Sequence, residues 1–295
     1  MLIPKGIITA LATPMYENGS VNFNELRNQV NRMIESGIHG LFCLGTNGEF
    51  YALSEHEKIE ILKTVIDENK GRLPVYAGVG CVTTKDTVQL AQKAQECGAD
   101  ALSVITPYFG QVSQIELYNH YRSVAESTDL PVVLYNIPAR TGNSIDCETL
   151  EKLASIKNIV AIKDSSGNFD NTLKYLEVTQ REFAVLAGND SLILYTLIAG
   201  GVGAIAGCAN IFPFKMSQIY ELYNQNKLKE AMEIQDKIRY IRNCMTLGNP
   251  NSVVKRTVNL IGFPIGPARA PFDIPYTDCD PIIKKVLTMH YSEWK

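Results

Sequence analysis

The sequence predicts an α/β protein built as a (β/α)8 barrel, and three observations support this prediction. Eight short apolar runs alternate with amphipathic segments between residues 7 and 206. The runs show no strict apolar–polar alternation, as expected for parallel strands buried on both faces. Glycines mark several of the turns that lead from a helix into the next run. The expected strands are Ile7–Ala12, Leu41–Leu44, Val75–Val79, Ala101–Ile105, Val132–Tyr135, Ile159–Ile162, Phe183–Ala187 and Ala204–Ala206.

The segments between the runs have the features of helices. After the first run, apolar residues recur at helical spacing, and two later helices begin with a capping box, Ser54–Glu57 and Ser113–Glu116. Three turns before strands contain glycine at a helix end: Ser36–Leu41, Cys97–Leu102 and Gly200–Ile205. Glycine supplies the left-handed backbone conformation that such turns need.

Strict alternation of strand and helix predicts a barrel, and an open doubly wound sheet is the structural alternative. That alternative normally has a glycine-rich first turn, whereas the first turn here is Thr13–Gly19. After residue 212 the strand pattern stops. We therefore expect a catalytic barrel domain over residues 1–212 and a helical extension over residues 213–295 packed on it. Three segments of the extension are expected to be helices: Ile219–Asn226, Leu228–Met245 and Val253–Leu260.

Composition and charge exclude several classes of protein. Basic and acidic residues nearly cancel, 28 against 31, so neither a nucleic acid nor a membrane is an expected partner. Seven cysteines are scattered without a C-x-x-C pair, which predicts a reducing compartment. The apolar start carries no basic region or cleavage site, and no apolar stretch reaches the ~20 residues of a membrane helix. We expect a cytoplasmic protein.

Lys163 is the main candidate for chemistry, because active residues of such barrels lie where strands end. It closes the run Ile159–Ile162, so its amine is expected in an apolar barrel mouth. Removal from water disfavours the charged form and leaves some free amine. A free amine condenses with a ketone to form a Schiff base. A strand-end lysine that extends into solvent is the alternative interpretation.

The ends of neighbouring strands carry residues that suit the same chemistry. Tyr135 ends the adjacent strand and can relay protons if a hydroxyl such as that of Thr46 shares its hydrogen-bond chain, although it also fits a core position. The amides of Gly45–Gly48 suit a carboxylate, although most such segments are only turns. Arg140 would bind a second carboxylate bidentately, unless it is a solvated loop residue.

Other chemistries lack their residues. The four histidines never cluster at strand ends, which argues against a metal-dependent aldolase or a zinc hydrolase. Neither a nucleophile-elbow serine nor a phosphate-binding loop motif occurs. Gly78–Gly80 and Gly201–Gly203 lack the third glycine of a dinucleotide site. We expect no metal and no cofactor, and Ser165–Gly167 is interpreted most simply as a helix N-cap.

Together these features resemble the dihydrodipicolinate synthase / N-acetylneuraminate lyase family of pyruvate-dependent class I aldolases, from about Ile7 to at least residue 275. The motifs that carry the resemblance are Gly45–Glu49, Thr106–Tyr108, Tyr135–Gly142, Ile162–Gly167 and Leu186–Asp190. The resemblance implies that Lys163 forms the Schiff base, that Tyr135 relays protons, and that Thr46–Asn47 binds the pyruvate carboxylate.

The resemblance also implies further substrate contacts and an assembly. The main-chain carbonyl of Ile205 is expected near the reacting carbon, and Arg140 is the feature that binds the carboxylate of aspartate semialdehyde in the synthase branch. Tyr108 and Ser165, which follow the fourth and sixth strands, are assigned to substrate binding as well. The expected partners are pyruvate and a small aldehyde, and the expected assembly is a homotetramer formed by two tight dimers.

Two departures bear on the substrate. Synthases usually have Thr-Thr where this chain has Thr46-Asn47, and a second tyrosine, which reaches across the dimer, where it has Phe109. Gly266–Pro271 and Gly45–Phe50 look closer to the catabolic branch, which includes aldolases for 4-hydroxy-2-oxoglutarate and 2-keto-3-deoxy-sugar acids. Arg140 favours the synthase, which condenses pyruvate with aspartate semialdehyde, by a small margin. N-acetylneuraminate cleavage and a pyruvate-binding pseudoenzyme are the remaining alternatives.

Overall fold

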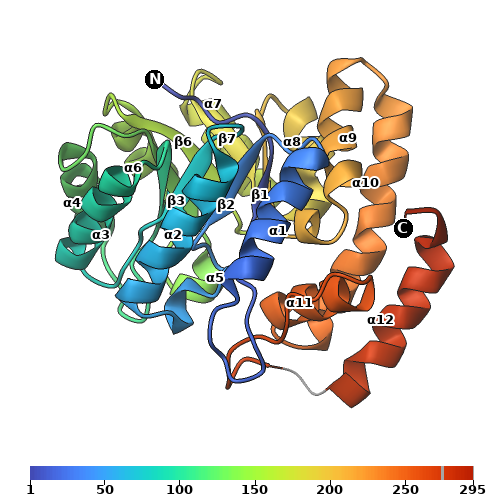
Figure 1. Cartoon of the computed structure of the whole chain (residues 1–295). Coiled ribbons are helices and arrows are strands. Elements are labelled where there is room, and N and C mark those ends of the chain that lie inside the picture. Colours follow the sequence, from blue (N-terminus) through green and yellow to red (C-terminus); the bar gives the residue numbers. More distant parts are fainter. Residues whose placement is uncertain (274–275, 295) are drawn as a thin grey trace.

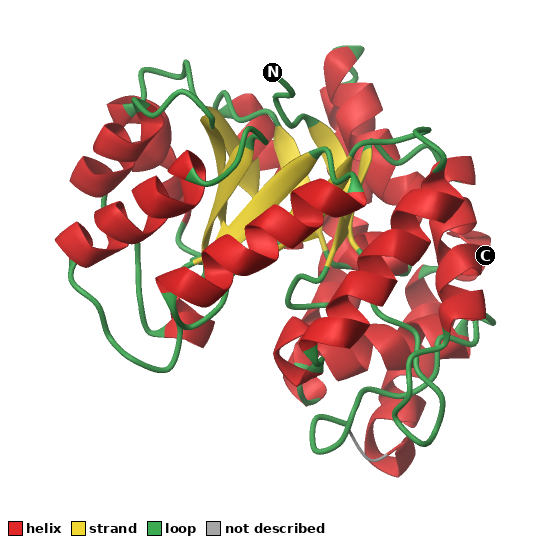
Figure 2. Cartoon of the chain, turned by 60° about the vertical axis from the view of Figure 1, so that its left-hand side comes forward, coloured by secondary structure: helices red, strands yellow, loops and turns green. Residues whose placement is uncertain are grey.

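The computed structural model describes residues 1–273 and 276–294. Eight parallel strands pair in chain order, and β8 returns to β1, so the sheet closes into the predicted (β/α)8 barrel. Figure 2 shows the strands at the centre with helices packed around them. Each predicted run contains a strand, with boundaries that differ by at most two residues. The strands are β1 Gly6–Ala10, β2 Gly40–Cys43, β3 Val75–Gly78, β4 Ala101–Ile105, β5 Val132–Asn136, β6 Ile159–Asp164, β7 Ala184–Ala187 and β8 Gly203–Ala206.

Helices follow the strands and form the outer layer (Figure 1). Both predicted capping boxes are confirmed, since Ser54 and Ser113 each exchange hydrogen bonds with the glutamate three residues later. None of the described helices is long and apolar enough to cross a membrane. The helices up to β8 are α1 Phe23–Glu35, α2 Glu55–Asn69, α3 Thr84–Cys97, α4 Gln114–Glu126, α5 Pro138–Thr141, α6 Cys147–Ala154, α7 Phe169–Val178 and α8 Ile193–Ile198.

Apolar side chains fill two separate layers of the barrel. A small cluster, which includes Phe42, Val133 and Leu186, fills the interior. A much larger cluster lies between the strands and the surrounding helices. Because both faces of every strand are covered, the strands read as unbroken apolar runs rather than alternating ones. Polar side chains are therefore informative where they occur at the strand ends.

The last part of the chain is helical, as predicted, and packs on the barrel. In Figure 1 these helices form an orange and red layer on one side of the sheet, and α10 and α12 lie next to each other. The predicted helices are present, although the first begins at Pro213 rather than Ile219 and the third at Pro250 rather than Val253. A fourth was not predicted. The division of the chain at residue 212 into two domains stays a prediction. The helices are α9 Pro213–Asn224, α10 Leu228–Asn243, α11 Pro250–Leu260 and α12 Tyr276–His290.

Candidate active site

Lys163 and Tyr135 are neighbours at the carboxyl ends of β6 and β5. The two residues are directly opposite in the strand register. Lys163 is only 3% exposed. Its Nζ lies 3.9 Å from the centre of the Tyr135 ring and 5.4 Å from that of Phe42. In the described part of the chain, no carboxylate forms an ion pair with Lys163. Two aromatic rings therefore lie beside the amine, whereas the cavity wall around it also carries polar groups such as Asn47 and Ser165, so the mouth is less apolar than the sequence predicted.

Thr46 extends this pair into a chain of polar groups. The hydroxyls of Thr46 and Tyr135 are 3.1 Å apart, although the two residues are 89 positions apart in the chain. Either hydroxyl is able to donate, so the contact allows a proton to pass in both directions. The geometry thus brings together the three residues that the sequence assigned to catalysis, and their catalytic roles remain predictions.

A cavity of about 310 Å³ opens over these residues. Most of the predicted site residues line it: Thr46, Asn47, Tyr135, Arg140, Lys163, Ser165 and Ile205. Tyr108 does not line it. Instead, Tyr108 lines an adjoining cavity of about 220 Å³, together with Phe50, Tyr51 and Phe272. Thr46, Arg140 and Asn251 border both cavities, so the aromatic cavity is the immediate neighbour of the one over Lys163.

The loop Gly45–Glu49 has a backbone suited to an anion. The amides of Gly48 and Glu49 donate to the carbonyls of Gly45 and Thr46, at 3.0 and 3.1 Å, and close the turn. Among the described residues, the amides of Thr46 and Asn47 have no such partner, which leaves them for a carboxylate. Leu44 precedes the loop with φ 59°, and its carbonyl comes so close to Gly78 that a Cβ there would lie 2.1 Å from the oxygen. Gly78 therefore makes room for this strained turn.

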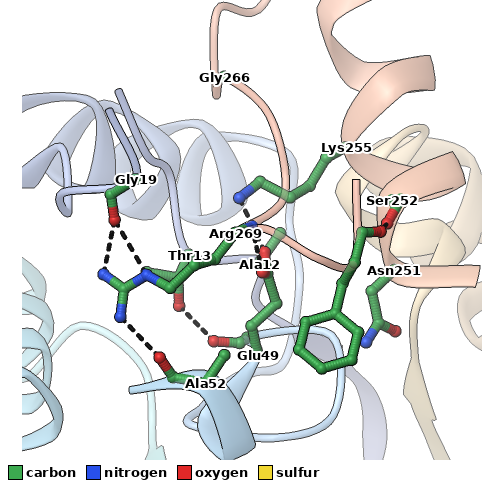
Figure 3. Close-up of polar contacts among 12 residues, drawn as sticks. Ala12, Thr13, Gly19, Glu49, Ala52, Asn251, Ser252, Lys255, Gly266 and Arg269 are labelled. Atoms are coloured by element: carbon green, nitrogen blue, oxygen red, sulfur yellow. Dashed lines mark hydrogen bonds and ion pairs between the residues drawn. The ribbon is translucent and has the colours of Figure 1, made fainter. Parts of the chain in front are cut away.

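A buried ion pair holds the other end of the loop, and sequence reasoning missed it. Lys255 Nζ lies 2.8 Å from Glu49 Oε1, and the two side chains are 1% and 0% exposed. The second carboxylate oxygen of Glu49 accepts a 2.8 Å hydrogen bond from the amide of Arg269. Figure 3 shows Lys255 and Arg269 converging on Glu49. Burial lowers the pKa of Lys255, and the Glu49 carboxylate partly offsets that effect.

The segment after Lys163 corrects one prediction. The N-cap of α7 is Asn168, whose side chain accepts from the amide of Asp170, so Ser165–Gly167 does not cap the helix. Ser165 comes too early because Asp164 first folds the chain into a turn, accepting from the amide and the hydroxyl of Ser166. The Ser165 hydroxyl oxygen is buried and has no partner among the described residues. This orphaned hydroxyl on the cavity wall supports its assignment to substrate binding.

Two arginines make the cavity electropositive. Arg140 reaches it from α5, as the sequence indicated, and Arg242 lines it from α10, which the sequence reasoning missed. Neither guanidinium forms an ion pair within the part of the chain that the structure describes. Asp190, the acidic residue on the cavity wall, accepts from the amides of Gly207 and Cys208 at 3.1 Å each. The cavity therefore suits a ligand with more than one negative charge.

Residues 3–289 match the dihydrodipicolinate synthetase family. The chain belongs to that family. It is similar to 4-hydroxy-tetrahydrodipicolinate synthase 1 of Halalkalibacterium halodurans, with 35% identity over 271 residues, which cover 92% of each chain. This match confirms the resemblance seen in the sequence. The chain is therefore a class I aldolase or lyase.

Solved structures of this family agree with the fold. A chloride-inhibited dihydrodipicolinate synthase of Acinetobacter baumannii, complexed with pyruvate, aligns with a TM-score of 0.93 at 31% identity and covers 96% of this chain and 98% of its own. YagE, a prophage protein of E. coli K12 also solved with pyruvate, aligns with a TM-score of 0.92 at 30% identity, over 96% of this chain and 97% of its own. Pyruvate is thus a ligand of family relatives.

Proposed function

We propose that the chain is a pyruvate-dependent aldolase in which Lys163 forms a Schiff base. One observation carries the proposal: Lys163, which is buried and has no ion-pair partner among the described residues, lies against Tyr135, whose hydroxyl is 3.1 Å from that of Thr46, at the edge of an open cavity. This arrangement supplies a nucleophilic amine and a proton relay at one point.

The chemistry follows from these groups. The Lys163 nitrogen adds to the ketone carbon of pyruvate, and water leaves to give a cationic imine. The imine draws electrons from the methyl group, which loses a proton towards Tyr135 and becomes an enamine. The enamine carbon then attacks an aldehyde and forms the new carbon–carbon bond, while the aldehyde oxygen takes a proton. Thr46–Asn47 hold the carboxylate of pyruvate during these steps.

For the aldehyde we favour a small, anionic compound, with aspartate semialdehyde first. This would make the chain a 4-hydroxy-tetrahydrodipicolinate synthase. The curated relatives at about 35% identity carry that name. Arg140 and Arg242 on the cavity wall provide positive charge for a second carboxylate.

Cleavage of a 2-keto-3-deoxy-sugar acid, 4-hydroxy-2-oxoglutarate or N-acetylneuraminate is the second candidate. Asn47 on the cavity wall favours this second candidate. It stands where synthases usually have a second threonine, and its side-chain amide offers both a donor and an acceptor to the substrate. Phe109 favours it too, since it lacks the hydroxyl of the usual tyrosine. The similarity to YagE shows that relatives outside the synthase name share the fold.

An aldehyde panel tests the proposal. Purified protein with pyruvate should exchange the methyl protons of pyruvate with solvent and consume aspartate semialdehyde with the highest kcat/KM. A preference for glyoxylate, for N-acetylmannosamine or for cleaving a sugar acid would support the second candidate. Saturable pyruvate binding without proton exchange would identify a pseudoenzyme. Arg140→Ala and Arg242→Ala should weaken the use of anionic aldehydes more than that of neutral ones.

We also propose a homo-oligomer, a dimer of dimers, and a cytosolic location. Phe109 is fully exposed with φ 75°, beside the aromatic cavity that Tyr108 lines, and an exposed aromatic side chain at that point suits a subunit contact. The seven free cysteines suit a reducing compartment. Sedimentation of the wild type and of Phe109→Asp should separate tetramers from smaller species.

A further inference from the structure

We infer that Asn251 is a positioning residue, which holds the peptide of Thr46 so that the Thr46 hydroxyl meets Tyr135. The inference concerns the site described above and therefore rests on the proposed function. Asn251 belongs to α11, in the C-terminal helical layer, and it touches the catalytic loop from outside the barrel.

Two hydrogen bonds hold the side-chain amide group of Asn251. Its Nδ2 donates to the carbonyl of Thr46 at 2.7 Å and to the hydroxyl of Tyr51 at 3.0 Å. Both amide hydrogens are thereby used, and the residue is only 3% exposed. The Tyr51 ring in turn packs edge-on against Phe272, with ring centres 4.8 Å apart. A side chain held at both hydrogens cannot turn without losing a buried hydrogen bond.

The orientation of the Thr46 peptide depends on the hydrogen bonds to its carbonyl. The carbonyl accepts from Asn251 and also from the amide of Glu49, at 3.1 Å, so two donors define the orientation of this peptide. The hydroxyl of the same residue is the group that contacts Tyr135. A rotation of the Thr46 backbone would move that hydroxyl and the free amides beside it together.

The helix that presents Asn251 is itself tied to the loop. Lys255 follows Asn251 by four residues, which places both side chains on one face of α11. Asn251 binds the loop at Thr46 and Lys255 binds it at Glu49, three residues further on. Since Lys255 and Glu49 are both buried, sliding α11 along the loop would leave a charge without its partner. The ion pair thus sets the register in which Asn251 reaches Thr46.

Two variants separate positioning from general stabilisation. Asn251→Leu removes both donors and keeps the branched shape and the number of heavy atoms of the side chain. Asn259→Leu is the matched control, because Asn259 lies on the same helix and bonds the backbone of Gly266 at 2.8 and 3.0 Å, away from Thr46. We expect Asn251→Leu to slow the proton exchange of pyruvate by about 10–100-fold, the usual effect of a small misplacement, and Asn259→Leu to leave it nearly unchanged.

A double-mutant cycle with Thr46→Val asks whether Asn251 acts through Thr46. In that background Asn251→Leu should cause little further loss, because the hydroxyl to be positioned is already absent. The inference would be overturned if the rate losses of Asn251→Leu and Thr46→Val multiplied in the double variant. Equal rate losses in Asn251→Leu and Asn259→Leu would also overturn it.

A crystal structure of Asn251→Leu gives a readout that does not depend on activity. The Thr46 and Tyr135 hydroxyls should move beyond hydrogen-bond distance, and an unchanged contact would overturn the inference. If the wild type exchanges no pyruvate protons, the proposed function fails, while this comparison of structures still decides the role of Asn251.

Discussion

Two buried lysines in this molecule have opposite surroundings. Lys255 is 1% exposed and bonded to a carboxylate that is also buried. Lys163 is 3% exposed, and in the described residues it has aromatic rings beside it and no carboxylate partner. The carboxylate beside Lys255 offsets part of the cost of burying its charge, whereas the described residues offer Lys163 no such compensation. Burial alone therefore does not single out a candidate for a reactive lysine, and the counter-charge is what distinguishes the two sites.

The largest expected effect is the complete loss of covalent chemistry in Lys163→Met. Pyruvate with borohydride should add one reduced pyruvyl group per wild-type chain, in the peptide that contains Lys163. Lys163→Met should not be labelled, and neither should Lys163→Arg, since a guanidinium stays protonated. Mass spectrometry of the digested protein measures this. A pyruvyl label on Lys255 would show that the lysine paired with a carboxylate also reacts, which would contradict the contrast drawn between the two lysines.

Tyr135→Phe should fold normally and lose about 10²–10⁴-fold in turnover, because one relaying hydroxyl disappears. Tyr121→Phe is the matched control, since it removes a buried tyrosine hydroxyl that bonds the Val104 carbonyl at 3.2 Å, away from the cavity. Steady-state kinetics of both variants give the answer. Equal rates in the two variants would make Tyr135 a core residue only.

Lys255→Met should lower the free energy of unfolding by about 3–5 kcal/mol, because it leaves the Glu49 carboxylate buried and unpaired. Adding Glu49→Gln should restore part of this loss. The control is Lys63→Met, which removes an exposed pair with Glu60 and should cost less than about 1 kcal/mol. Urea unfolding measures all of these values. A small loss in Lys255→Met would mean that the Glu49 carboxylate tolerates burial without its cation, which would weaken the contrast between a paired and an unpaired buried lysine.

His120 is buried with no ion-pair partner among the described residues, and this should appear as a pH dependence of stability. Burial lowers the pKa of His120 from 6.5 to about 4, and its Nδ1 lies 2.9 Å from the Thr84 hydroxyl. Because the unfolded chain takes up this proton first, stability should fall as the pH drops from 6.5 towards 4, by about 2–3 kcal/mol.

The variant His120→Gln should flatten that part of the curve, whereas His56→Gln, at an exposed position, should not. Unfolding at a series of pH values measures both slopes. Parallel curves for the wild type and His120→Gln would show that another group titrates.

Much of the barrel and of its mouth could be predicted because the signals are local. A run such as Ile159–Ile162 identifies a buried strand by itself, and the rule that active residues follow strand ends then selects Lys163 and Tyr135. The register of β5 and β6 shows that Lys163 and Tyr135 lie directly opposite each other. The sequence suggested this only through the order of the strands.

The features that were missed depend on distant parts of the chain. No local pattern marks Asn251 or Lys255 as partners of a loop some 200 residues earlier, or Arg242 as part of the cavity wall. Each looks like an ordinary polar residue on a helix. α12 was not predicted because Pro281, inside it, normally interrupts a helix. Tyr108 follows a strand end as expected, but Phe50 and Tyr51 fill the space beside it, and it lines the adjoining cavity instead.

The contacts of α11 with the loop at Glu49 have a consequence for synthesis of the chain on the ribosome. The loop is made early, yet its partners Asn251, Lys255 and Arg269 follow 205, 206 and 220 residues after the positions they bind. A nascent chain can complete all eight strands before any of these partners leaves the exit tunnel. During that interval the Glu49 carboxylate lacks its cation and must be solvated by water. The nascent barrel is therefore incomplete at this end and open to misfolding. Because of the order in which the chain emerges, the loop Gly45–Glu49 is among the last parts of the molecule to reach its final form.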